Sequence, residues 1–250
     1  MDKKIALITG ATSGIGAACA QRFYKEGYNI IITGRRKDRL EKFAFKLDSQ
    51  RVLSLCFDVR DRNHVTKTLE SLPEEWRKID VLVNNAGLAL GLSTFFKGDM
   101  DHWDTMMDTN VKGLLYVSRS VSQGMIERKS GHIINIGSIA GKEVYANGNV
   151  YCASKHAVDA LSKAMRIELA EFGIRVSGVH PGAVETEFSE VRFEGDTEKA
   201  ALVYKGFENL VAEDIADAVY FIASRKPHVN INDLVIMPQA QPVASVIHRK

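Results

Sequence analysis

The sequence predicts a three-layer α/β/α sandwich in which a doubly wound parallel sheet carries helices on both faces. Two observations lead to this fold class. Short runs of branched apolar residues alternate with longer amphipathic stretches, which is the βαβα order typical of parallel sheets. The chain of 250 residues also contains no internal repeat, low-complexity segment or Pro/Ser/Gly linker. We therefore expect a single domain over residues 1–250.

The expected strands are the short apolar runs, which are typical of strands buried on both faces. They are residues 5–8, 29–33, 52–57, 81–83, 132–136, 175–179 and 234–236. The expected helices have apolar residues at three- and four-residue spacing. They are residues 15–26, 39–47, 63–72, 100–128, 153–171 and 213–224. The polar segment 185–205 follows a strand end, where ligands bind in this architecture, and we expect a substrate lid there.

Composition excludes several classes of partner. Thirty-three basic and 31 acidic residues give a net charge of +2, which does not favour nucleic acid or an anionic membrane. Three cysteines without metal-type spacing indicate reduced thiols, and none of the seven histidines has metal-ligand company, so no metal is expected. No signal-type apolar region or membrane span of about 20 apolar residues is visible, and we expect a cytoplasmic protein.

A glycine-rich turn follows the first expected strand and leads directly into a helix. Gly10, Gly14 and Gly16 have the spacing Gly-x-x-x-Gly-x-Gly, which departs from Gly-x-Gly-x-x-Gly. It meets the same demands: a tight turn, close approach of the backbone to pyrophosphate, and close packing of the helix on the sheet. Such a turn also suits an ordinary loop, but its position after the first strand favours a Rossmann-type dinucleotide site.

The end of the second expected strand indicates which dinucleotide binds. NAD sites usually place a carboxylate there, about 20 residues beyond the glycines, to hold the ribose 2′-hydroxyl. This chain has Arg35 and Arg36 instead, whose guanidinium groups match a 2′-phosphate. The alternative is that both arginines simply begin the next helix in solvent. We interpret the pair as a sign of NADP.

Tyr151 and Lys155 lie one helical turn apart, and Ser138 lies thirteen residues upstream. A phenol beside an ammonium group can move a proton, and a proton donor near a hydride donor is what a carbonyl reductase needs. A tyrosine four residues before a lysine can also be a surface pair that arose by chance. The glycine-rich turn upstream favours the catalytic interpretation.

Together these motifs resemble those of the short-chain dehydrogenase/reductase family. In chain order they are Thr9-Gly10-x-x-x-Gly14-x-Gly16, Asp58-Val59, Asn84-Asn85-Ala86-Gly87, Asn110, Ser138, Tyr151-x-x-x-Lys155 and Pro181-Gly182. Residues 87–91, 191–196 and 229–238 further resemble the NADP-dependent 3-hydroxy acid dehydrogenases, also described as serine or allo-threonine dehydrogenases and malonic semialdehyde reductases. The resemblance covers essentially the whole chain.

The resemblance implies the roles of individual residues. Tyr151 would be the general acid or base, Lys155 would favour its phenolate, and Ser138 would orient the substrate oxygen. Asn110 would kink its helix and hold a water of the proton relay to Lys155. The cofactor site would comprise Gly10, Thr12, Ser13, Gly14, Ile15, Gly16, Arg35, Arg36, Asp58, Val59, Asn84, Asn85, Ala86, Gly87, Tyr151, Lys155, Pro181, Gly182, Val184 and Thr186. His180, just before Pro181, is interpreted as structural.

A hydroxy-acid substrate requires a cation for its carboxylate, and Arg192 in the expected lid is the candidate. Glu143, Tyr145 and Asn149 flank the catalytic helix and would shape the pocket together with Ser138. The implied function is NADP-dependent interconversion of a small 3-hydroxy acid and its 3-oxo acid or semialdehyde, in a homotetramer formed through residues 100–128 and 153–171. Two alternatives stay open: a reductase of a 3-oxoacyl thioester, sugar or steroid, and a non-catalytic NADP-sensing protein.

Overall fold

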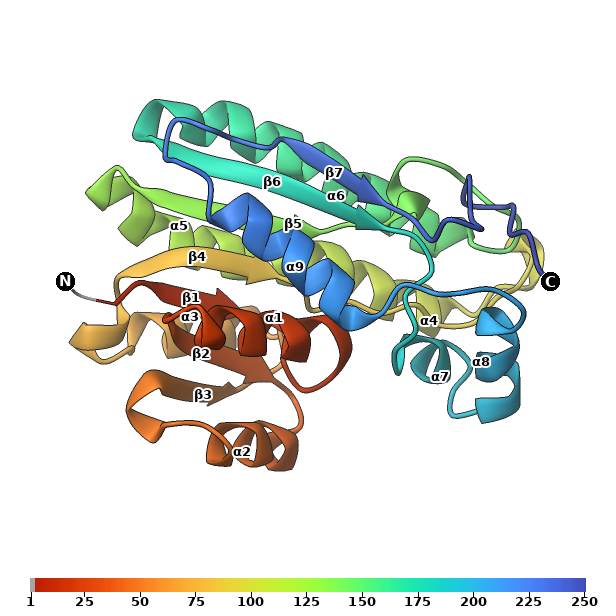
Figure 1. The fold of residues 1–250 in the computed structure, drawn as a ribbon, viewed down its shortest axis with the longest axis horizontal. Coiled ribbons are helices and arrows are strands. Elements are labelled where there is room, and N and C mark those ends of the chain that lie inside the picture. The colour runs from red at the N-terminus through yellow and green to blue at the C-terminus, as the bar shows by residue number, and fades with distance from the viewer. Residues whose placement is uncertain (1–2) are drawn as a thin grey trace.

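A parallel seven-stranded sheet lies between two layers of helices in the computed structural model, which describes residues 3–250 (Figure 1). The strands are β1 (Ile5–Ile8), β2 (Asn29–Gly34), β3 (Val52–Cys56), β4 (Ile79–Asn84), β5 (Gly131–Ile136), β6 (Ile174–Pro181) and β7 (Asp233–Ile236). Their order across the sheet is β3-β2-β1-β4-β5-β6-β7, and every pairing is parallel. The predicted doubly wound sandwich is confirmed.

The helices divide between the two faces of the sheet. They are α1 (Gly14–Lys25), α2 (Lys37–Phe45), α3 (Arg62–Glu70), α4 (Met100–Met107), α5 (Leu114–Arg128), α6 (Asn149–Leu169), α7 (Phe188–Arg192), α8 (Thr197–Tyr204) and α9 (Ala212–Ala223). Side chains of α1, α2 and α9 fill the core on one face, and those of α3, α5 and α6 fill the core on the other. The helix α1 lies against α9, as Figure 1 shows.

Strand β1 shows how one short sequence supplies both cores. Ala6 and Ile8 belong to the cluster under α1 and α9, whereas Ile5 and Leu7 belong to the cluster under α3 and α5. Successive side chains of a strand point to opposite faces of its sheet, so a strand covered on both faces must be apolar throughout. This is why the central strands read as unbroken apolar runs.

The long helix expected over residues 100–128 is interrupted. A π-helical turn, η4 (Asp108–Gly113), separates α4 from α5. A π-turn inserts one extra residue into a helix, which a helical pattern of apolar residues does not reveal. Asn110 lies within this turn and is buried. The apolar pattern alone predicted one continuous stretch, whereas the family resemblance implied a kink at Asn110, and the π-turn lies at that residue.

The segment expected to form the lid contains two short helices, α7 and α8. Asp196 caps α8 by accepting a hydrogen bond from the backbone N–H of Lys199. In Figure 1 these helices lie beyond the carboxyl ends of the strands, beside α4. Their helical pattern was hidden because each exposes most of its side chains and buries only Ser189 or Ala200.

None of the helices formed by residues 3–250 is both long and apolar enough to cross a membrane. The three cysteines, all within the described residues, are unpaired thiols. Cys19 and Cys152 are buried and Cys56 is exposed.

Candidate active site

The glycine-rich turn between β1 and α1 brings backbone into very close contact with its neighbours. A Cβ atom on Gly16 would lie 2.3 Å from the carbonyl oxygen of Gly10 and 2.4 Å from Nδ2 of Asn85. Gly10 and Gly14 have φ angles of +66° and +51°, which favour glycine. The turn thus directs the amino-terminal end of α1, with its partial positive charge and unpaired N–H groups, toward an anion.

A cavity of about 480 Å³ opens at the carboxyl ends of the central strands. It is lined by most of the residues that the sequence pointed to: Gly10, Thr12, Ser13, Gly14, Ile15, Arg35, Arg36, Asp58, Val59, Asn85, Ala86, Gly87, Ser138, Tyr145, Tyr151, Lys155, Pro181, Gly182, Val184, Thr186 and Arg192. They come from the segments that follow β1 to β6 and from the helices α6 and α7, which are distant in the sequence. Such a crevice, where strand order reverses around β1 and β4, is where doubly wound folds bind ligands.

Arg36 is held at one end of this cavity by hydrogen bonds from its guanidinium group. Its Nη2 donates to Oγ1 of Thr12 at 2.7 Å and to Oγ of Ser13 at 2.8 Å, and its Nη1 pairs with Glu187 at 3.1 Å. Arg35 lies 3.7 Å from the carboxylate of Asp58, and its side chain is 54% exposed. Arg36 therefore borders the glycine-rich turn and Arg35 lines the same cavity, as a site for a second phosphate requires.

The sequence did not predict Glu187 as a partner of Arg36. Its carboxylate accepts hydrogen bonds from Arg36 and, at 2.7 Å, from Nη1 of Arg39. Burial pushes the pKa of Glu187 upward, but the hydrogen bonds from Arg39 and Arg36 outweigh it and hold this pKa below its ordinary value. The carboxylate is therefore ionised and partly neutralises the positive charges of Arg36 and Arg39. It lies 151 residues from Arg36, and no local signal predicts such a pair.

The two asparagines at the end of β4 have different surroundings. Asn85 donates from Nδ2 to the backbone carbonyls of Thr9 and Gly10, at 2.9 and 3.2 Å, and so fixes the glycine-rich turn. Asn84 points into the buried interior, where its Nδ2 donates to Ser118 and Asn135. Among the described residues, the side chain of Asn84 is not part of the cavity lining. The structure therefore does not show a direct contact between this side chain and the cofactor.

Asn110 ties the π-turn to the loop after β4, which carries Gly87. Its Oδ1 accepts from the N–H of Leu88, and its Nδ2 donates to the carbonyl of Leu88 and to Oγ of Ser154, at 2.8 to 3.0 Å. A Cβ on Gly87 would lie 3.1 Å from Oδ1 of Asn110 and 3.6 Å from Nζ of Lys155. Asn110 and Lys155 thus approach the same glycine, although 45 positions separate them in the sequence.

Tyr151 and Lys155 project from the first half of α6 into the cavity and are only 8% and 6% exposed. This burial excludes the simpler interpretation of a surface helix pair. Burial raises the pKa of the Tyr151 phenol above its ordinary value, and Ser138 exerts a smaller, lowering effect. Burial also lowers the pKa of Lys155 to about 8, while its Nζ donates to the carbonyl of Ile136 at 2.9 Å. The arrangement places a phenol, an ammonium group and a hydroxyl around one space.

Arg192 of α7 reaches over the catalytic helix from the lid segment. Its Nε donates to the carbonyl of Gly91 at 3.2 Å, and its Nη2 donates to the hydroxyl of Tyr145 at 3.1 Å. The guanidinium carbon lies 5.6 Å from the centre of the Tyr151 ring. Helix α7 therefore brings a cation next to the phenol, and donors of the Arg192 guanidinium group remain for a ligand.

Glu143 and Asn149, expected to shape the pocket, have structural contacts. The carboxylate of Glu143 accepts from the N–H of Ala244 at 2.8 Å. Asn149 donates to the carbonyl of Ser93 at 2.9 Å and borders a smaller neighbouring cavity. Neither belongs to the lining of the main cavity in residues 3–250. The long loops that meet here are far apart in the sequence, so their contacts were not predictable from it.

Known proteins resemble this chain over nearly its full length. The family described as short chain dehydrogenase matches residues 4–197. The NADP-dependent 3-hydroxy acid dehydrogenase YdfG of Salmonella typhi is 49% identical, over 98% of this chain and 99% of that protein. The serine 3-dehydrogenase of Rhizobium radiobacter is 44% identical, over 95% of each chain.

A solved structure resembles the fold equally well. The closed form of serine dehydrogenase complexed with NADP+ has a TM-score of 0.94 and 46% sequence identity, covering 98% of this chain and all of that one. The predicted family resemblance is thus confirmed. The sandwich, the glycine-rich turn and the helix with Tyr151 and Lys155 agree with it, and the protein belongs to the short-chain dehydrogenase family.

Proposed function

We propose that the protein is an NADP-dependent oxidoreductase that interconverts a small 3-hydroxy acid and its 3-oxo acid or semialdehyde. Serine, allo-threonine, 3-hydroxyisobutyrate and 3-hydroxypropionate are the candidate hydroxy acids. One observation carries the proposal: the buried Tyr151, Lys155 and Ser138 share a cavity with the glycine-rich turn and Arg36. The printed functions of the relatives, which name NADP, 3-hydroxy acids and serine, support it.

Tyr151 is the proposed general acid and base. During oxidation its phenolate takes the proton of the substrate hydroxyl, and during reduction its hydroxyl returns the proton to the carbonyl oxygen. Lys155 supplies a positive charge one helical turn away, which stabilises the phenolate against its burial. Ser138 holds the substrate oxygen, and Asn110 holds a water of the proton relay to Lys155.

The nicotinamide of NADP supplies or accepts the hydride. The chain provides the rest of the site. The cradle of Gly10, Gly14 and Gly16 fits a pyrophosphate, because a Cβ on Gly16 would clash with Gly10 and Asn85 and the positive φ angles of Gly10 and Gly14 favour glycine, so these glycines allow the tight turn. Arg35 and Arg36 bind the 2′-phosphate as charged hydrogen-bond donors. The other proposed cofactor contacts are Thr12, Ser13, Ile15, Asp58, Val59, Asn85, Ala86, Gly87, Pro181, Gly182, Val184 and Thr186.

Arg192 is the proposed reader of the substrate carboxylate. A bidentate guanidinium fixes both the position and the orientation of a small acid. Two of its hydrogen bonds, to Gly91 and Tyr145, hold the side chain in place before the substrate arrives. Residues 185–205, which carry Arg192 and Glu187, form the proposed lid of a single catalytic domain.

Arg192 favours hydroxy acids over the other substrates considered. A thioester, sugar or steroid carries no carboxylate next to the reacting carbon and would leave a charge beside Tyr151 unused. A protein that only sensed NADP would not need to bury Tyr151 and Lys155, because burying such groups is costly. Both the reductase of another carbonyl and the NADP-sensing protein therefore fit the site less well than a hydroxy-acid dehydrogenase.

A substrate panel tests the proposed function. We expect NADPH formation, followed by its absorbance, with serine, allo-threonine, 3-hydroxyisobutyrate or 3-hydroxypropionate, and much slower turnover of matched neutral alcohols. NAD replaces NADP in a parallel series and should support little activity. A protein that binds NADPH tightly but oxidises none of these acids would contradict the proposal.

The substitution Arg192→Ala tests the carboxylate contact. We expect kcat/KM for 3-hydroxy acids to fall about 10- to 100-fold, because a hydrogen bond to a charged group contributes about 1.5–3 kcal/mol. Turnover of neutral alcohols should change by much less, since they make no such contact. An unchanged preference between acids and alcohols would remove Arg192 from the substrate site.

The proposed assembly is a homotetramer in the cytoplasm. The tetramer rests on the family resemblance and on exposed apolar side chains of the long central helices. Among these are Leu115 of α5, 37% exposed, and Ile167 of α6, 79% exposed. Large apolar side chains exposed on adjacent long helices fit a contact with another copy of the chain.

A further inference from the structure

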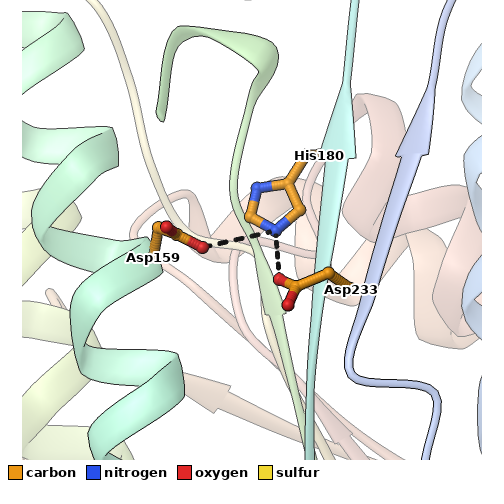
Figure 2. A group of neighbouring side chains, drawn as sticks. All are labelled: Asp159, His180 and Asp233. Carbon is orange, nitrogen blue, oxygen red and sulfur yellow. Dashed lines mark hydrogen bonds and ion pairs between the residues drawn. The ribbon is translucent and has the colours of Figure 1, made fainter. Parts of the chain in front are cut away.

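A group of charged side chains surrounds a fully buried histidine just behind the candidate active site. Figure 2 shows His180 of β6 between Asp159 of α6 and Asp233 of β7. Its Nε2 lies 3.0 Å from Oδ1 of Asp233 and 3.9 Å from Oδ1 of Asp159. The expectation that no histidine has metal-type ligands beside it is wrong for His180, because its neighbours lie 21 and 53 positions away in the sequence.

The cluster is closed by a lysine. Nζ of Lys142 lies 2.6 Å from Oδ1 of Asp159 and 3.3 Å from Oδ1 of Asp233. These are the same two oxygens that face His180, so the ammonium group lies where a metal ion would have to bind. Lys163 and Arg166 pair with the remaining oxygens at 2.7 and 3.7 Å. The carboxylates are therefore neutralised by side chains of the chain itself.

The imidazole of His180 fills a slot that two glycines leave open. A Cβ on Gly137 would lie 2.4 Å from Nδ1, and a Cβ on Gly178 would lie 2.6 Å from Nε2. Within residues 3–250, Nδ1 has no hydrogen-bond partner. The ring is thus packed tightly on one side and anchored only through Nε2 on the other.

The charge state of His180 follows from these neighbours. Burial lowers its pKa, the hydrogen bond to Asp233 opposes this effect, and the positive charge of Lys142 adds to it. The net pKa lies below the ordinary value, so the ring is neutral near pH 7. Because a carboxylate only accepts, Nε2 carries the proton and donates it to Asp233.

The position of the ring links the three parts of the candidate active site. Gly137 immediately precedes Ser138, His180 immediately precedes the cofactor wall at Pro181 and Gly182, and Asp159 lies one helical turn beyond Lys155. A shift of the ring therefore displaces the serine loop and the cofactor wall relative to each other.

We propose that His180 is a positioning residue that, through Asp233, Asp159 and Lys142, fixes the distance between the cofactor wall and the Ser138–Tyr151 pair. This inference rests on the proposed dehydrogenase function. It concerns the alignment of hydride transfer and not the affinity for either ligand. Misplacing reacting groups by about 1 Å costs on the order of 10²-fold in rate.

The test compares His180→Leu with His180→Gln, using the wild-type substrate identified by the panel. His180→Leu should lower kcat about 10- to 100-fold per NADPH-binding site while KM for NADP changes by less than about 2-fold. The isotope effect with substrate deuterated at the carbinol carbon should increase, because hydride transfer limits the rate. His180→Gln, which keeps a donor near the Nε2 position, should recover most of the loss.

His132 provides the matched control. It is also a buried histidine, 1% exposed, and its Nε2 lies 2.9 Å from Oγ of Ser177, but it is at the opposite, amino-terminal end of β5. His132→Leu should lower the thermal stability and leave kcat per binding site unchanged. If His180→Leu does not fold, Asp233→Ala, at a side chain 30% exposed, should lower kcat about 5-fold by removing the acceptor of His180.

Several results would overturn this inference. These are a kcat of His180→Leu per binding site equal to that of His132→Leu, a His180→Gln variant no better than His180→Leu, and an Asp233→Ala variant with unchanged kcat. Stoichiometric binding of Zn²⁺ that His180→Leu abolishes would instead identify a metal site. A wild-type protein inactive on the whole panel would refute the proposed function itself, whereas an active wild type with an indifferent His180 would refute only the positioning role.

Discussion

Tyr151→Phe is expected to lower kcat for oxidation of the hydroxy acid about 10²- to 10⁴-fold, the usual contribution of a positioned acid or base. The substitution removes only the hydroxyl oxygen, so the ring still packs against Phe188, whose centre lies 5.7 Å away. NADPH binding, followed by its fluorescence, should be nearly unchanged. The loss is therefore expected in kcat and not in the affinity for the cofactor.

Tyr145→Phe is the matched control. Tyr145 lines the same cavity, and its hydroxyl accepts a hydrogen bond from Arg192. Because Tyr145 has no role in proton transfer, its substitution should reduce kcat less than about 10-fold. A Tyr151→Phe protein with near wild-type kcat, or equal losses in the two variants, would rule out Tyr151 as the general base.

The pH dependence of the wild-type protein extends this prediction. Burial raises the pKa of Tyr151 above its ordinary value, so only a small fraction is phenolate at neutral pH. Oxidation, which needs the phenolate, should become faster as the pH rises from neutral, and reduction, which needs the phenol, should not. Lys155, with its pKa lowered to about 8, loses its charge above that pH and with it the support of the phenolate. Tyr151→Phe should abolish the rise.

The double substitution Arg35→Ala with Arg36→Ala is expected to raise KM for NADPH about 10²-fold or more. Each charged hydrogen bond to a phosphate contributes about 1.5–3 kcal/mol, and every 1.4 kcal/mol corresponds to about a factor of ten. NADH has no 2′-phosphate, so its KM should change only a few-fold. Steady-state kinetics with NADPH and with NADH gives the change in each KM, and the ratio of these changes shows whether the arginines contact the 2′-phosphate.

Two variants separate the arginines' contact from simple loss of charge. Lys37→Ala with Lys42→Ala also removes two positive charges, from α2, which follows the two arginines, and should leave KM for NADPH within about 2-fold of the wild type. Glu187→Gln should lower KM for NADPH by up to about 5-fold, because its carboxylate competes with the phosphate for Arg36. Equal effects of the arginine substitutions on both cofactors would refute the NADP assignment.

Part of the site was predictable because it depends on residues that lie close together in the sequence. The spacing of Gly10, Gly14 and Gly16 reflects the conformation of a single turn, and Tyr151 and Lys155 share one face of one helix. Arg35 and Arg36 follow directly from the end of β2. In each case the relevant neighbours lie within a few residues in the chain.

The rest of the site depends on loops that meet only after folding. Glu187 reaches Arg36 from the lid, and Glu143 turns to the N–H of Ala244 instead of the pocket. Asn84 lies in the interior although its neighbour Asn85 faces the glycine-rich turn. Successive side chains at a strand end point in opposite directions, and the motif alone does not say which one faces the ligand.

The sequence by itself determined the alternation of strands and helices outside residues 185–205, the glycine-rich turn, the cationic end of β2 and the Tyr151–Lys155 pair, because apolar periodicity and turn geometry act over short stretches of chain. Only the tertiary structure decided the π-turn at Asn110, the pairing of Glu187 with Arg36, and the burial of His180 between Asp159 and Asp233. These contacts depend on how the sheet brings distant loops to one edge, since parallel strands end together there whatever their separation in the chain.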